Sequence, residues 1–231
     1  MSDWISFYDF KHSVIYVNAR HRDVHYRTIA TDIRAYVPSP AASVLDYGCG
    51  EATSADLVAA ACAQLTLVEA APNVRAALKA RYEGNAKISV LTPDEAAAQP
   101  AASFDLIVLH SVAQYLTAAQ LDGLLATFHK LVKPGGLVIV GDIVPPTLAA
   151  PAAALALLRF AVVNGFFWAA VGGLMRIFVS DYLRLKKMVG LSHYTEAAML
   201  DKLKRAGFAA ERAPRNIGHN QRRMTFLARP V

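Results

Sequence analysis

The chain contains 231 residues, of which 55% are hydrophobic, and it carries a net charge of +6 at neutral pH. This length allows one α/β domain with an insert, and the apolar content excludes a disordered protein. Two cysteines are too few for a disulfide framework, so we expect free thiols and a cytoplasmic location. The positive charge favours anionic surroundings, either nucleic acid or an acidic lipid surface.

Residues 1–40 are expected to form a helical cap ahead of the first strand. From about residue 19 to residue 37, apolar side chains recur at helical spacing, and Pro38-Ser39-Pro40 should end that helix. The aromatic stretch 1–18 fits no single periodicity and lacks the apolar core of a secretory signal.

A short apolar strand and a glycine loop follow in V-L-D-Y-G-C-G-E-A-T, residues 44–53. Asp46 is expected to end the strand, while Gly48 and Gly50 allow a tight turn beside a ligand before a helix begins. Thr53 stands where a dinucleotide-binding fingerprint places its third glycine, which argues against a nicotinamide or flavin cofactor. The loop therefore predicts a cradle for some other cofactor.

The next elements complete a nucleotide-binding βαβ unit. A helical face is predicted after the loop, formed by Leu57, Val58, Ala61, Cys62 and Leu65. A strand over 65–68 then ends in Glu69, about 20 residues beyond Asp46, where such a unit places the carboxylate that binds ribose hydroxyls. A second helix should begin at Pro72 and end at Gly84.

Three more strands are predicted in the central part of the chain. The third covers 88–91 and ends at T-P-D-E, residues 92–95, and the fourth is the apolar run 104–111, typical of a central parallel strand. Thr117 and Gln120 form a capping box for the helix that follows, and the turn K-P-G-G at 133–136 leads into a fifth strand over 137–140.

These motifs span about residues 40–145 in the order found in class I S-adenosylmethionine-dependent methyltransferases, which the sequence resembles. The glycine loop is similar to that family's D-x-G-C-G-x-A/G motif, and F-D-L-I-V at 104–108 and K-P-G-G are similar to its later motifs. The resemblance implies a Rossmann-like, doubly wound α/β fold, with a seven-stranded sheet, helices on both faces and an antiparallel last strand. It implies S-adenosylmethionine as cofactor and S-adenosylhomocysteine as product.

The family pattern also implies which residues contact the cofactor. The loop glycines approach its amino acid portion, Glu69 binds the ribose, and Asp94, with Glu95 beside it, binds the adenine amino group. An equally weighted alternative is that these acids only favour the start of a helix through its dipole. The implied cofactor contacts are Asp46, Gly48, Cys49, Gly50, Glu69, Ala70, Asp94, Glu95, His110 and Ser111.

Beyond the core segment 41–145, residues 146–190 form an apolar helical insert after the fifth strand. Between Arg159 and Arg176 no residue is charged, but this stretch is shorter than the roughly 20 residues of a membrane-spanning helix. We expect a lid over the acceptor site, or a hairpin that lies on a membrane surface with its arginines at the headgroups. The basic residues 184–187 favour the membrane version, although a solvated helical face explains them as well.

Residues 191–231 complete the core with a helix and two strands. Thr195 should cap the helix, Gly207 should end it, and strands over 209–212 and 224–228 should form an antiparallel hairpin. The polar loop 215–223 between the strands is either a segment that faces the substrate or an exposed loop.

An acceptor hydroxyl would need a base with a pKa near neutrality, which histidine supplies. His110 leaves the fourth strand and His219 lies in the late loop, so these two are the candidate catalytic residues, with His12, His21 and His25 of the cap as further candidates. Candidate substrate contacts are Tyr16, His21, Tyr115 and Asn220. No cluster has metal-ligand spacing, so no catalytic metal is predicted.

The leading hypothesis is a methyltransferase that acts on a small, apolar or lipid-like acceptor by in-line methyl transfer, in the cytoplasm or at the membrane surface. One alternative is a nucleic-acid methyltransferase, which is disfavoured because H-S-V-A at 110–113 replaces the N/D-P-P-Y motif of amino-methylating enzymes. Another is a partner subunit that binds S-adenosylmethionine without catalysis. The sequence does not predict an oligomeric state.

Overall fold

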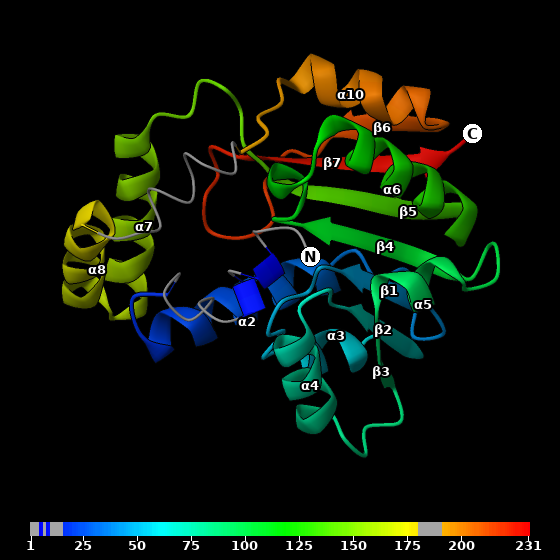
Figure 1. Cartoon of the computed structure of the whole chain (residues 1–231), viewed down its shortest axis with the longest axis horizontal. Helices are drawn as coiled ribbons and strands as arrows, with labels where there is room; N and C mark the ends of the chain where they lie inside the picture. Colours follow the sequence, from blue (N-terminus) through cyan, green and yellow to red (C-terminus); the bar gives the residue numbers. More distant parts are fainter. Residues whose placement is uncertain (1–4, 7, 10–15, 180–190) are drawn as a thin grey trace.

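The computed structural model describes residues 5–6, 8–9, 16–179 and 191–231. Within this part of the chain, seven strands form one sheet in the order β3-β2-β1-β4-β5-β7-β6 (Figure 1). The strands are β1 (Ser43–Tyr47), β2 (Gln64–Val68), β3 (Ile88–Leu91), β4 (Phe104–His110), β5 (Val132–Ile143), β6 (Phe208–Arg212) and β7 (Met224–Pro230). Strands β1 to β5 pair in parallel, and β7 runs antiparallel to both β5 and β6. The predicted Rossmann-like, doubly wound sheet is confirmed.

Helices cover both faces of the sheet. On one face, α6 (Ala118–Leu131) and α10 (Glu196–Arg205) contribute Leu121, Phe128 and Leu203 to a buried cluster with β4 and β5. On the other, α2 (Ala19–Arg34), α3 (Ala55–Ala59) and α4 (Pro72–Arg81) pack against β1, β2 and β4. The side chains of residues 106–109 are fully buried, because β4 is central and covered on both faces.

The capping signals in the sequence are confirmed. The Thr117 side chain accepts from the N–H of Gln120 while Gln120 reaches back to Thr117, and Thr195 accepts from the N–H of Ala198. The predicted hairpin of β6 and β7 is also present. The first long helix ends at Arg34, a few residues earlier than its apolar pattern indicates.

Two local predictions were wrong. The helix after the glycine loop ends at Ala59, so the predicted helical face is too long, and Leu65 belongs only to β2, the strand predicted over 65–68. This strand begins at Gln64, where it pairs in register with β1. The predicted turn K-P-G-G lies inside β5, as a bulge between the pairs Phe104–Val132 and Leu106–Leu137.

Lys133 of this bulge has a structural role that the motif did not reveal. Its Nζ lies 2.8 Å from Oδ2 of Asp105, which also accepts from the N–H of Ser43 at 2.7 Å. Residues of the two motifs F-D-L-I-V and K-P-G-G therefore connect the amino-terminal ends of β1, β4 and β5, at the opposite end of these strands from the glycine loop.

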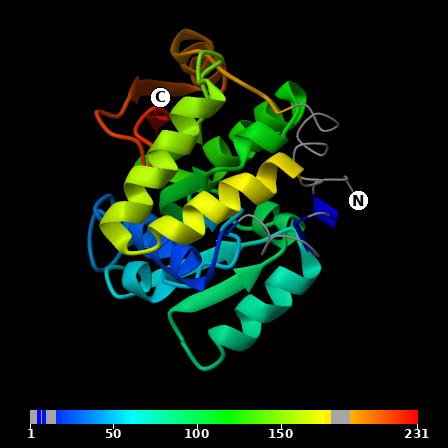
Figure 2. The same ribbon diagram turned by 90° about the vertical axis from the view of Figure 1, so that its left-hand side faces the viewer.

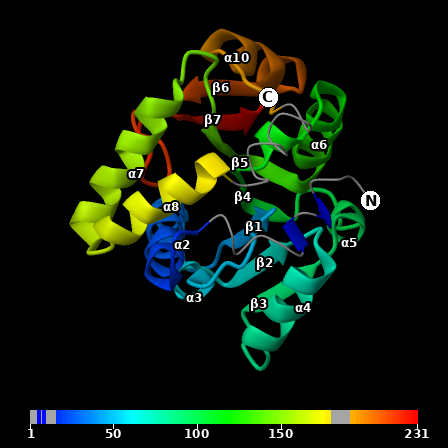
Figure 3. The same cartoon turned by 60° about the vertical axis from the view of Figure 1, so that its left-hand side comes forward.

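The apolar insert folds as a helical hairpin of α7 (Ala150–Asn164) and α8 (Phe167–Val179), which lies beyond the carboxyl ends of the strands and beside α2 (Figures 1 and 3). Gly165 ends α7 with a φ of 73°, a left-handed conformation that glycine adopts readily. Among the described residues, no helix is both long and apolar enough to cross a bilayer. The basic residues 184–187 and His12 lie outside the described residues.

Candidate cofactor and acceptor site

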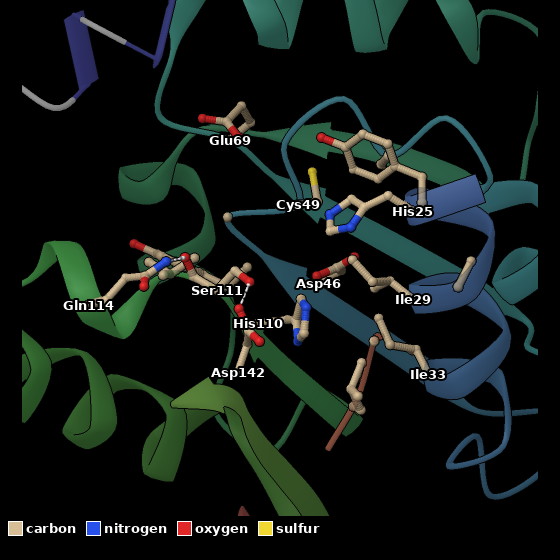
Figure 4. Close-up of a pocket in the computed structure, with 18 of the residues that line it drawn as sticks. His25, Ile29, Ile33, Asp46, Cys49, Glu69, His110, Ser111, Gln114 and Asp142 are labelled. Atoms are coloured by element: carbon tan, nitrogen blue, oxygen red, sulfur yellow. Dashed lines mark hydrogen bonds between the residues drawn. The ribbon is translucent and has the colours of Figure 1, made fainter. Parts of the chain in front are cut away.

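A cavity of about 590 Å³ opens at the carboxyl ends of β1 and β4, where the order of the strands reverses. Its walls come from α2, the glycine loop, the chain after β4, α7 and the loop between β6 and β7. Figure 4 shows Glu69 at one end, His110 and Asp142 toward the other, and Asp46 and Cys49 between them. Segments far apart in the sequence thus share one cavity.

At one end of the cavity, the glycine loop and Glu69 form a cradle. The Glu69 Oε2 atom accepts from the N–H of Gly50 at 3.0 Å, and Oε1 accepts from the N–H of Ala71 at 2.8 Å. These bonds fix the carboxylate and leave each oxygen a lone pair for a ligand hydroxyl. Burial raises the pKa of Glu69, against the lowering effect of these N–H groups.

The structure shows why positions 48 and 50 of the loop require glycine. Both have a positive φ, 73° at Gly48 and 61° at Gly50. A Cβ at Gly48 would lie 2.4 Å from Cγ2 of Val112, and one at Gly50 would lie 2.6 Å from the hydroxyl of Tyr8. The turn is therefore packed against the chain after β4 and against the N-terminal segment.

A second carboxyl group lies beside Glu69. Asp46 lies within β1 rather than at its end, and burial, with a smaller effect from the charge of Glu69, raises its pKa to about 7. A positively charged ligand in this part of the cavity would lower that pKa, because it favours the carboxylate. Cys49 is buried next to this pair, and burial raises the pKa of its thiol, which disfavours the reactive thiolate.

The predicted adenine acids do not line the cavity. Thr92 and Glu95 form a capping box at the start of α5 (Pro93–Ala97), with Glu95 Oε2 2.7 Å from the N–H of Thr92. Asp94 is exposed. Burial and, to a smaller extent, the charge of Asp94 raise the pKa of Tyr47, a residue that does line the cavity. The helix-start role therefore holds for Glu95, whereas binding of adenine by Asp94 stays a prediction.

At the other end, Ser111 and Asp142 lie side by side at the ends of β4 and β5. Ser111 Oγ donates to Asp142 Oδ2, and Arg223 donates to the same oxygen. Asn216 Nδ2 lies 3.3 Å from the other oxygen, Oδ1. Burial opposes ionisation, but Arg223 and these hydrogen bonds outweigh it and hold the pKa of Asp142 below its ordinary value.

Both Ser111 and Asp142 adopt a positive φ, 59° and 64°. Residues other than glycine rarely do so, and such strain often occurs at functional sites. Sequence reasoning did not single out Asp142, although a polar residue directly after a buried parallel strand is a signal that could have found it.

Four histidines surround this end of the cavity, namely His21, His25, His110 and His219. Burial lowers the pKa of His110 and of His219, while the charge of Asp142 opposes both shifts. Burial lowers the pKa of His21 to about 4 and that of His25 to about 3, helped by neighbouring histidines. All four shifts favour the neutral form of the ring at pH 7.

A comparison with known protein families identifies the part of the chain that carries the glycine loop and Glu69. Residues 44–136 match the model of a family described as a methyltransferase domain. No curated protein matches the sequence significantly. Residues 44–136 therefore carry a methyltransferase domain, with the fold of the class I S-adenosylmethionine-dependent enzymes.

Several solved structures share this fold. Magnesium protoporphyrin IX methyltransferase from Synechocystis with bound S-adenosylhomocysteine has a TM-score of 0.60 at 17% identity, covering 93% of this chain and 88% of that one. A DhpI–SAH complex has a TM-score of 0.62 at 12% identity, covering 98% and 94%. Human N-acetylserotonin methyltransferase has a TM-score of 0.56 at 16% identity, and this chain, 90% covered, spans 52% of that enzyme.

The structure brings most of the predicted site residues of the methyltransferase into one cavity. Those that line it are Tyr16, His21, Asp46, Gly48, Cys49, Glu69, Ala70, His110, Ser111, Tyr115, His219 and Asn220. Gly50 lies behind the wall and acts through its bond to Glu69. The polar loop 215–223 faces the cavity, so it is not merely an exposed loop. Its Gly218 N–H donates to Asp32 Oδ2 of α2 at 2.8 Å.

Sequence reasoning missed two tyrosines of the methyltransferase, Tyr8 and Tyr26. Both line the cavity beside the glycine loop, and the Tyr26 hydroxyl accepts from the N–H of Glu51 at 2.9 Å. Tyr26 belongs to the helical face of α2 that was predicted to be apolar core. Its ring satisfies that pattern, while its hydroxyl end supports the loop.

Proposed function

We propose that this methyltransferase transfers the methyl group of S-adenosylmethionine to a small, apolar acceptor bound under α7. The observation that carries the proposal is one cavity with two chemically different ends. The Glu69 end has fixed acceptor oxygens and two carboxyl groups, whereas the other end is lined by neutral imidazoles and by Ala153 and Leu157 of α7. A donor and an acceptor could therefore be held in line, which supplies much of the rate enhancement in such a transfer.

The residues at the Glu69 end suit the cofactor. When bound, S-adenosylmethionine supplies a methyl group on a positively charged sulfonium. Glu69 would accept hydrogen bonds from the ribose hydroxyls, because its oxygens are oriented by the loop N–H groups. The carboxyl groups of Asp46 and Glu69 would attract the positive charges of the cofactor.

The other end suits an acceptor with little charge. Its histidines are neutral at pH 7, and its ion pair of Asp142 and Arg223 is internally balanced. A charged acceptor would have to lose its hydration in a buried cavity, which costs free energy unless a partner replaces the water. Two structural neighbours are named for small-molecule acceptors, magnesium protoporphyrin IX and N-acetylserotonin, which agrees with a small molecule as the acceptor.

His110 is the best candidate for the base that takes the acceptor proton. Its ring is buried, its pKa is lowered by burial, and its Nδ1 atom has no hydrogen-bond partner among the described residues. The charge of Asp142 would stabilise the imidazolium that forms when His110 takes up the proton. His219, stacked on Phe160 with ring centroids 4.5 Å apart, is the second candidate.

Two measurements test the proposal in sequence. Isothermal titration calorimetry should show binding of S-adenosylmethionine to the purified protein and no binding of NAD; the reverse would refute the cofactor. Radiolabelled S-adenosylmethionine is then added with the protein to a cell lysate, and the products are partitioned. Label in the organic phase supports an apolar acceptor, whereas label confined to precipitated nucleic acid or protein, or to the water phase, contradicts it.

A further inference from the structure

The exposed large apolar side chains of this protein are concentrated on the α7–α8 hairpin. The exposed fractions are 84% at Val163, 81% at Trp168, 70% at Met175 and 63% at Val162. Elsewhere in the described part of the chain, only the terminal Val231 belongs to this class. Val162, Val163 and Trp168 flank the turn at Gly165, so they form an apolar tip.

Helix α7 is apolar on both its inner and outer faces. On the inner face, Leu157 and Ala161 belong to a small apolar cluster with Phe166 and Val17, and Leu157 also lines the cavity. Leu155, Val162 and Val163 recur at the helical spacing i, i+7, i+8 on the outer face, yet they are exposed. Arg159 is the one charged residue of α7. A helix that is apolar on nearly all sides is normally buried, so this outer face indicates a surface that becomes covered.

The charges around the tip indicate what covers it. No acidic residue occurs in 143–180. The exposed Arg159 lies one turn before Val163 on the same face, and Arg20 of α2 donates from Nε to the carbonyl of Asn164 at the turn. Long basic side chains beside an apolar surface place their charge at lipid phosphates while their neighbours enter the apolar boundary.

We propose that the α7–α8 hairpin docks this protein on the surface of an anionic bilayer. The apolar tip of Val162, Val163 and Trp168 enters the boundary between headgroups and acyl chains, and Arg20 and Arg159 face the phosphates. Figure 2 shows α7 and α8 lying across one side of the molecule, so that they can meet a flat surface. Because Ala153 and Leu157 of α7 line the cavity, this docking places the acceptor end next to the bilayer. That last step rests on the proposed function.

The test is sedimentation of the full-length protein with vesicles of phosphatidylglycerol and phosphatidylcholine, compared with phosphatidylcholine alone. The wild type should bind the anionic vesicles more strongly. Val163→Glu and Trp168→Glu should each weaken this binding by at least about tenfold, because each removes a large apolar group from the boundary and adds a negative charge. Arg159→Gln should weaken binding to the anionic vesicles several-fold and change binding to the neutral ones little.

Val231→Glu is the matched control. It makes the same substitution at a valine with 85% exposure, at the chain end far from the hairpin, and should bind like the wild type (Figure 1). The inference is overturned if the wild type does not bind vesicles, or if Val163→Glu binds as well as Val231→Glu. It is also overturned if the wild type forms a dimer that Val163→Glu dissociates without any change in vesicle binding, because a second copy then covers the tip.

Calorimetry with S-adenosylmethionine on the same samples keeps the two proposals separate. A protein that binds vesicles but not S-adenosylmethionine refutes the proposed function alone. One that binds S-adenosylmethionine but not vesicles refutes the docking alone.

Discussion

Replacing Glu69 by alanine is expected to weaken the binding of S-adenosylhomocysteine, the stable product of the transfer. The two carboxylate oxygens are held by the N–H groups of Gly50 and Ala71 at 3.0 and 2.8 Å, which leaves one lone pair on each for the ribose. In the variant, the ribose hydroxyls lose their hydrogen bonds to the carboxylate, and water replaces these bonds only in part. The loss should weaken the binding free energy by about 1–3 kcal/mol. The dissociation constant should therefore rise roughly 5- to 150-fold.

The assay is isothermal titration calorimetry at pH 8, because a high pH favours the carboxylate of Glu69, whose pKa is raised by burial. Glu69→Gln should also bind weakly, because its amide offers one acceptor oxygen in place of two and sets an NH₂ group against a backbone N–H. Glu83→Ala, which removes an exposed carboxylate after α4, is the control. If Glu69→Ala folds, as its circular dichroism shows, and still binds within twofold of the wild type, Glu69 is not the ribose ligand.

Three more results are expected. Glu95→Ala should lower the melting temperature slightly, through loss of the capping box, and leave calorimetric affinity unchanged; a large loss of affinity would restore the adenine role. His110→Asn should keep cofactor affinity but slow methyl transfer by about 100-fold or more, and equal single-turnover rates would exclude it as the base. Because the pKa of His21 falls to about 4 on folding, the unfolded chain takes up its proton first as pH falls below about 6.5. Between pH 6.5 and 5, His21 should contribute about 1–2 kcal/mol to the loss of stability in urea, in addition to the contribution of His25, and His21→Phe should lessen the loss by that amount.

The cofactor cradle could be predicted because its signals are local. The apolar run of β1, the glycines at 48 and 50 and the acid at the end of β2 lie within one βαβ unit, where parallel pairing brings the ends of neighbouring strands together. The role of Glu95 could not be settled in this way, because a carboxylate at a helix start and a carboxylate at a ligand have the same sequence pattern. Only the bond to Thr92 separates them.

The acceptor end could be predicted only in part. His110 and the late loop stood out as polar groups near strand ends, but Asp142 is joined to Ser111 and Arg223, which lie 31 and 81 positions away in the sequence. Such pairs form only when β4, β5 and β7 assemble. The positive φ angles of Ser111 and Asp142 are likewise set by that assembly and not by local preference.

The sequence by itself determined the succession of strands and helices along the chain, the helix caps, the class of cofactor site and the position of the apolar insert. These features depend on short-range periodicity and motif spacing. Tertiary structure alone decided which apolar face of α7 packs on Phe166 and which remains exposed, since both sides of that helix are largely apolar. It also decided the charge of the acceptor end, because the pKa of each histidine there depends on burial and on neighbours from distant segments.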